Sequence, residues 1–111
     1  GMPRASSLEE IFENVETGFN PEKAEGVNAV FQFNVTGEGG GQYWARIQNQ
    51  QIEVERGEHA SPDMIMTASA EDFLAVFNGE LNPMMAFMQG KIKVKGEMAL
   101  ALKLQTILGL A

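Results

Sequence analysis

The chain of 111 residues contains no cysteine and only one histidine, one tryptophan and one tyrosine. Without cysteine there is no disulfide, thiolate metal site or cysteine nucleophile, and a reducing compartment is favoured, so we expect a cytoplasmic location. No apolar run reaches the roughly 18–20 residues that a membrane span needs. The first residues also lack the apolar segment of a secretory signal. We interpret Gly1 as a tag remnant and residues 2–111 as one domain.

Basic side chains are scarce as well, because 8 Lys and Arg face 15 Asp and Glu, for a net charge of -7. Proteins that bind nucleic acid usually present a basic face, so we expect no nucleic-acid partner. The charge is unevenly distributed. Residues 1–88 hold 4 basic and 14 acidic side chains, whereas residues 89–111 hold 4 lysines and a single acid, Glu97. The basic end of the chain is also its most apolar end.

The side chains that could perform covalent chemistry have simpler structural explanations. His59 lies in a polar turn with no partner that would make it a general base, and we interpret it as an exposed turn residue. Ser69 and Asp72 belong to a predicted helix start. The glycine-rich residues 37–41 join two predicted strands and do not open a helix, so they form a hairpin turn and not a phosphate loop. No cluster of acids and histidine has metal-ligand spacing, and we predict a protein without enzymatic activity, metal or cofactor.

Apolar periodicity predicts grouped helices and strands. Ser6 or Ser7 can cap a first helix, and a short second helix follows Asn20. The first helix has an apolar face at helical spacing, made of Leu8, Ile11, Phe12, Val15 and Phe19. Alternating apolar and polar residues then predict three strands, at residues 29–36, 43–48 and 51–56. A loop at residues 57–62 leads to a fourth strand near Met64–Ala68.

The second half of the chain is predicted to be mostly helical. Helices are expected from Ser69 to Gly79, at residues 84–89, and from Glu97 to about Leu108, with a fifth strand at residues 91–95. Strands and helices are grouped and do not alternate. The fold class is therefore α+β, a five-stranded, mostly antiparallel sheet with one solvated face and helices packed on the other.

Apolar residues in this half exceed what two packed layers require. Six of the seven methionines lie between residues 64 and 98, and methionine recurs where a surface must fit several apolar partners. Residues 83–88 are apolar on nearly every face, and such a helix must be covered all round. The C-terminal helix also has a wide apolar stripe. A buried core, a homodimer interface and the wall of an apolar ligand site all remain open.

An ordered set of short motifs runs through the chain: Glu71-Asp72-Phe73, Asn78-Gly79-Glu80-Leu81, Pro83, Ala86-Phe87-Met88, Gly90-Lys91-Ile92-Lys93-Val94-Lys95-Gly96, Met98, Leu100-Ala101 and Lys103-Leu104. Upstream there are the strand and turn at residues 31–37, the glycine-rich turn, Trp44, and the loop at residues 57–63. Together these motifs resemble the sterol carrier protein-2 (SCP2) lipid-transfer family, and the resemblance extends from about Leu8 to Leu108.

The resemblance implies a hydrophobic tunnel between the helices and the sheet. It also implies non-covalent binding of sterols, fatty acids, fatty acyl-CoAs or similar lipids. The given residues include neither the peroxisomal tail of eukaryotic members nor a partner enzyme domain, so we expect a protein similar to the small free-standing members. We expect the tunnel to be lined by Phe33, Ile47, Phe73, Phe77, Met84, Met85, Phe87, Met88, Ile92, Val94, Met98 and Leu102.

Lys91, Lys93 and Lys95 alternate along the last predicted strand, so all three point to one face. Beside an apolar opening they would favour transient contact with an anionic membrane. Alternatively, they protect an exposed strand edge or solvate the outer face. The sequence thus predicts a lipid carrier, monomeric or weakly dimeric. The competing interpretation is a homodimerising interaction module whose apolar surface is a protein interface.

Overall fold

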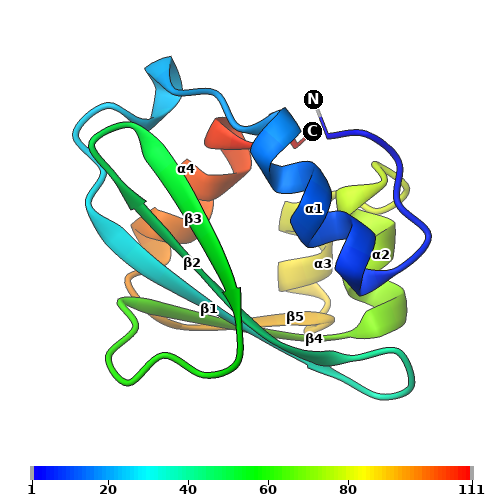
Figure 1. The fold of residues 1–111 in the computed structure, drawn as a ribbon. Helices are drawn as coiled ribbons and strands as arrows, with labels where there is room; N and C mark the ends of the chain where they lie inside the picture. Colours follow the sequence, from blue (N-terminus) through cyan, green and yellow to red (C-terminus); the bar gives the residue numbers. More distant parts are fainter. Residues whose placement is uncertain (1, 111) are drawn as a thin grey trace.

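Five strands form a single mixed sheet in the computed structural model, which describes residues 2–110 (Figure 1). The strands are β1 (Ala29–Thr36), β2 (Gly41–Gln48), β3 (Gln51–Arg56), β4 (Met64–Ser69) and β5 (Ile92–Gly96). Their order across the sheet is β3-β2-β1-β4-β5, and only the β1–β4 pair is parallel among the described strands. The predicted α+β class and mostly antiparallel sheet are confirmed. The interpretation of Gly1 as a tag remnant lies outside the described residues.

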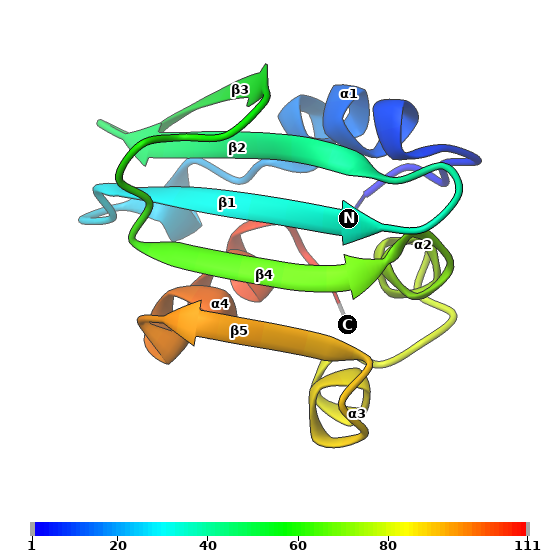
Figure 2. The same cartoon turned by 90° about the horizontal axis from the view of Figure 1, so that it is seen from below.

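The helices all lie on the same face of the sheet, as Figure 2 shows from the opposite side. They are α1 (Leu8–Gly18), the 3-10 helix η1 (Glu22–Ala24), α2 (Ala70–Phe77), α3 (Pro83–Met88) and α4 (Met98–Ile107). In Figure 2, α1 lies behind the β2 side of the sheet, α4 lies behind the β5 side, and α3 lies beyond the β5 edge. None of the helices within residues 2–110 has the length and apolar character to cross a membrane.

Three helices begin at capping residues, and two of these, Ser7 and Ser69, are predicted above from the sequence. Ser7 Oγ accepts a hydrogen bond from the Glu10 N–H at 3.2 Å, and Ser69 Oγ accepts one from the Asp72 N–H at 3.1 Å. Asn82 Oδ1 accepts from two backbone N–H groups in the first turn of α3, at 2.9 and 3.1 Å. These bonds satisfy donors that a helix N-terminus otherwise leaves free, so they fix where each helix starts.

An aromatic cluster forms the core beneath α1 and α2. The Phe12 ring stacks on Tyr43 with centroids 4.1 Å apart, and it also contacts Phe33 and Phe73 at 5.3 and 6.0 Å. Phe73 in turn stacks on Phe77 at 4.7 Å. The cluster therefore joins both helices to the centre of the sheet, and this half of the inner face is closely packed.

The sequence predicts a solvated outer face of the sheet, but this face is not solvated along its whole length. Val30 and Gln32 are buried, and Gln32 is only 1% exposed. The connection from β3 to β4 crosses this face (Figure 2) and bonds to both residues. Gln32 donates to the carbonyl of Gly57 at 3.1 Å and accepts from the His59 N–H at 2.9 Å, while Asp63 accepts from the Val30 N–H at 2.8 Å. This cover comes from a loop, so strand alternation alone did not reveal it.

Asn78, at the C-terminus of α2, ties the N-terminal segment to the helical layer. Its side chain donates to the Ala5 carbonyl and accepts from the Ala5 N–H, both at 2.8 Å. A hydrogen bond contributes about 0.5–1.5 kcal/mol, so Asn78→Ala should lower the free energy of unfolding by about 1–3 kcal/mol in urea denaturation.

Asn14→Ala is the matched control for Asn78→Ala. The Asn14 side chain bonds to carbonyls of the same N-terminal segment, but at an exposed position. Its removal should cost less than half as much, because water replaces the lost partners. Equal losses for the two variants would contradict a specific role of Asn78.

Candidate functional site

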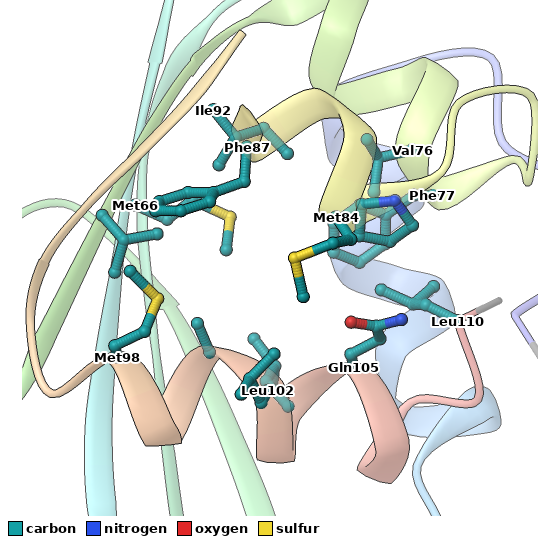
Figure 3. Close-up of a pocket in the computed structure, with 14 residues that line it drawn as sticks. Met66, Val76, Phe77, Met84, Phe87, Ile92, Met98, Leu102, Gln105 and Leu110 are labelled. Carbon is teal, nitrogen blue, oxygen red and sulfur yellow. The ribbon is translucent and has the colours of Figure 1, made fainter. Parts of the chain in front are cut away.

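A pocket of about 150 Å³ lies between α3 and α4 on the inner side of β4 and β5 (Figure 3). It is lined by Met66, Val76, Phe77, Pro83, Met84, Phe87, Ile92, Val94, Met98, Ala101, Leu102, Leu104, Gln105 and Leu110. Among these described residues, only Gln105 has a polar side chain. The pocket is thus an apolar space with one amide in its wall.

The floor of the pocket comes from β4 and β5. Met66 and Val94 are register partners in the two strands, and Ile92 lies two residues before Val94 on the same face. Because side chains alternate along a strand, these three project toward the helices. The edge strand β5 therefore contributes only apolar groups to the inner face at this point.

One wall is the six-residue helix α3, which is apolar throughout. Ala86 is its only buried residue, and the Lys91 N–H donates to the Ala86 carbonyl at 2.8 Å where the chain turns into β5. Met84 and Phe87 lie at the pocket. Met85 and Met88 are 50% and 73% exposed and lie outside it. The helix consequently has an anchored residue, a pocket face and an outward apolar face.

The opposite wall is α4, which is apolar on two sides. Leu100 and Ile107 are buried in the core, whereas Met98 and Leu102 are 40% and 47% exposed and line the pocket. Met98, Ala101, Leu102 and Gln105 follow the helical spacing of three and four residues, so they share one face of α4. The wide apolar stripe noted in the sequence thus serves the core and the pocket at once.

Four half-exposed side chains form the rim of the pocket: Met84, Phe87, Met98 and Leu102, all between 38% and 47% exposed. Large apolar side chains are usually buried, so exposed ones grouped around a hollow mark a site for an apolar partner. Figure 3 shows the Gln105 amide in the wall between Met84 and Leu110. An amide can both donate and accept hydrogen bonds.

The structure brings together seven of the twelve residues expected to line a lipid site: Phe77, Met84, Phe87, Ile92, Val94, Met98 and Leu102. Phe33, Ile47 and Phe73 do not line the pocket, because they are buried in the core and at most 2% exposed. Met85 and Met88 point outward from α3. The described space is a pocket, and a tunnel stays a prediction.

Seven lining residues were missed in the sequence: Met66, Val76, Pro83, Ala101, Leu104, Gln105 and Leu110. Helical spacing from Met98 and Leu102 would have indicated Ala101 and Gln105. The polar character of Gln105 and the small size of Ala101 hid them from a search for large apolar groups. The sequence carries no comparable signal for Leu110, which lies beyond the end of α4.

The lysines of β5 do not lie beside the pocket. Ile92 and Val94 face it, so Lys93 and Lys95 project from the opposite, outer face of the sheet. Lys91 is exposed just before the strand begins. The three lysines thus follow the edge of the sheet, on the other side of β5 from α4.

His59 is half-buried on the outer face, and its interpretation as an exposed turn residue is wrong. Its ring packs edge-on against Trp44 with centroids 4.9 Å apart. Its Nε2 atom lies 3.2 Å from the Arg46 guanidinium, and its Nδ1 atom accepts from the Ser61 N–H at 3.0 Å. The imidazole therefore has structural contacts on the side of the sheet away from the pocket. No group of three acids or histidines within residues 2–110 could hold a metal ion.

A second, shallow and acidic hollow lies between α1 and the β2–β3 strands, and it contains Glu9, Glu13, Glu16 and Glu55 with Phe12, Tyr43, Val54 and Arg56. Arg56 pairs with Glu9 at 2.9 Å between exposed side chains, which contributes little to stability. Burial raises the pKa of the Tyr43 phenol above its ordinary value of 10.0, and the nearby Arg56 partly opposes this. This side of the molecule is negatively charged.

Comparison with known proteins identifies the family. Residues 8–109 match the SCP-2 sterol transfer family, and the chain belongs to it. The sequence is 40% identical over 106 residues to hydroxysteroid dehydrogenase-like protein 2 of Xenopus laevis, covering 95% of this chain and 25% of that protein. The chain therefore spans about a quarter of the length of the curated relatives it matches.

Solved structures agree. The solution structure of palmitated SCP2L2 from Aedes aegypti is similar with a TM-score of 0.78 and 34% identity, covering 93% of this chain and 95% of that one. The sec-alkylsulfatase Pisa1 from Pseudomonas sp. contains a similar fold, with a TM-score of 0.82 over 94% of this chain and 16% of that one. Its 14% identity shows the fold alone. The resemblance seen in the sequence is confirmed.

Proposed function

We propose that this chain binds a sterol, fatty acid, fatty acyl-CoA or similar lipid non-covalently and transfers or presents it. The observation that carries the proposal is the pocket between α3 and α4, whose lining is apolar except for Gln105. Sites for small apolar molecules are typically concave and apolar with a few polar groups that fix orientation. Membership of a sterol transfer family supports the same function.

The size of the pocket indicates that ligand binding must enlarge it. A pocket of about 150 Å³ is smaller than the ~300–1,000 Å³ of most ligand sites. An engineered apolar cavity of about 150 Å³ holds a molecule of benzene size. A lipid tail would therefore extend through the rim or displace α3, which is short and has a single buried residue. Flexible methionine side chains on the rim allow such a change.

The chemistry of the lining indicates which part of the ligand enters. No charged side chain lines the pocket among the described residues, and an unpaired buried carboxylate or phosphate is costly. The apolar part of a lipid would enter and a charged head would remain at the rim. A neutral hydroxyl or carbonyl group could enter fully and bond to the Gln105 amide.

We propose that the chain acts without covalent chemistry. Gln105 is neither a nucleophile nor a general base, and His59 lies on the other face of the sheet. Relatives named as a hydroxysteroid dehydrogenase-like protein and an alkylsulfatase are much longer than this chain. In such proteins a domain of this kind would hold an apolar molecule for chemistry performed elsewhere.

Filling the pocket tests whether it is the binding site. Ala101→Phe places a ring in the pocket, so it should weaken binding of a fluorescent fatty acid by about tenfold or more, because the ligand loses the buried apolar contact. The matched control is Ala99→Phe on the same helix, at an exposed position that does not line the pocket. Fluorescence titration of both variants provides the comparison. Equal affinities for the two variants would refute the assignment.

Removing the Gln105 amide tests how the ligand is oriented. Gln105→Leu should weaken binding of a long-chain alcohol by about 2- to 10-fold, which corresponds to the free energy of one hydrogen bond. The affinity for the hydrocarbon of equal length should not change, because it makes no hydrogen bond. Displacement of the fluorescent fatty acid measures both ligands. Gln89→Leu, an exposed change outside the pocket, should alter neither. If Gln105→Leu weakened both ligands equally, the amide would have no part in recognition.

A further inference from the structure

We propose that the molecule docks on an anionic membrane through one edge, and that Met85 and Met88 enter the headgroup region there. This docking edge consists of α3, Lys91 and β5. The inference rests on the proposed carrier function, because a carrier must meet a membrane to load or release a lipid. It concerns the side chains of Met85, Met88 and the three lysines Lys91, Lys93 and Lys95, which are exposed and do not line the pocket.

The outward apolar face of α3 is the first observation. Met88 is 73% exposed and Met85 is 50% exposed, and neither lines the pocket. Only Ala86 of α3 is buried, so little of the helix is packed into the core and these two side chains face solvent. In Figure 2, α3 protrudes beyond β5 at the margin of the sheet. Adjacent exposed apolar groups of this kind mark an interaction surface.

The positive charge beside α3 is the second observation, and it indicates that the partner is an anionic membrane. Lys91, Lys93 and Lys95 are all exposed along the edge strand that α3 contacts. Between residues 81 and 110, Glu97 is the only acidic residue. Basic side chains next to exposed apolar ones match the surface of an anionic bilayer, where phosphates lie above the acyl chains.

Asp63 and Glu97 border the end of β5, but a larger group of acidic residues lies away from the docking edge. Glu9, Glu13 and Glu16 are on α1. This helix lies on the same face of the sheet as α3 but toward the opposite edge, on the β2 side and away from β5 (Figure 2). An anionic surface would repel that side and attract the docking edge. The separation of charge therefore orients the molecule, even though its net charge is -7.

Docking in this orientation would connect the pocket to the bilayer. Met84 and Phe87 belong to the same short helix as Met85 and Met88, but they form part of the pocket rim. When the outward face of α3 enters the headgroups, the rim comes next to the acyl chains. A lipid tail could then pass between bilayer and pocket with little exposure to water.

Vesicle binding by the full chain tests the proposal. The vesicles are phosphatidylcholine alone, or phosphatidylcholine with phosphatidylserine at about two to one. Met85→Gln/Met88→Gln and Lys91→Gln/Lys93→Gln/Lys95→Gln should each reduce sedimentation with the mixed vesicles by about tenfold at low salt. The lysine effect should disappear at high salt. Lys93→Gln alone should weaken binding more than Lys23→Gln, which removes the same charge from an exposed position on η1.

Binding of a fluorescent fatty acid without vesicles separates docking from the carrier function. Both multiple variants should retain wild-type affinity, because the substituted residues do not line the pocket. Retained fatty-acid affinity with unchanged vesicle binding would overturn the docking proposal and leave the carrier function intact. A wild-type dimer that becomes monomeric in Met85→Gln/Met88→Gln would also overturn it, since the face would then be an interface between two copies.

Discussion

The inner face of the sheet carries apolar side chains from edge to edge, and helices must shield this face from water. The helices that cover its two halves differ in how closely they pack against it. Beneath α1 and α2, rings such as Phe12 and Phe73 are buried and pack closely against one another and the central strands. Over β4 and β5 the cover consists of a short α3 and of α4, which is apolar on two sides. Protein interiors are normally close-packed, so the space left between these helices is the feature on which the proposed ligand site rests. The pocket, its rim and the outward face of α3 all follow from this unequal cover.

Much of the fold could be predicted from local patterns, because caps and periodicities are local. The face of α1 and the cap at Ser69 are examples. The site depended on long-range packing that periodicity does not describe. Phe33 alternates in the same way as Val94, yet β1 lies at the centre of the sheet and β5 at its edge, and the order of strands decides which of them borders a gap.

Two other outcomes show where sequence patterns are ambiguous. Residues 83–88 are apolar on every side, so the pattern could not indicate that Met88 faces solvent while Phe87 faces the pocket. In β5, by contrast, alternation correctly indicated that Lys93 and Lys95 share one face of the sheet. Because Val94 was assigned to the lining, the same alternation required Lys93 to point away from it, and the structure has that arrangement.

Methionine methyl groups allow the central claim, that the space between α3 and α4 holds the ligand, to be tested directly. The chain has seven methionines, and isotope labelling makes each methyl an NMR probe of its own surroundings. On addition of a long-chain fatty acid, the account predicts intermolecular nuclear Overhauser effects to Met66, Met84 and Met98, which line the pocket, and none to Met2 beside α1. Contacts to Met2 without contacts to the three pocket methionines would contradict it.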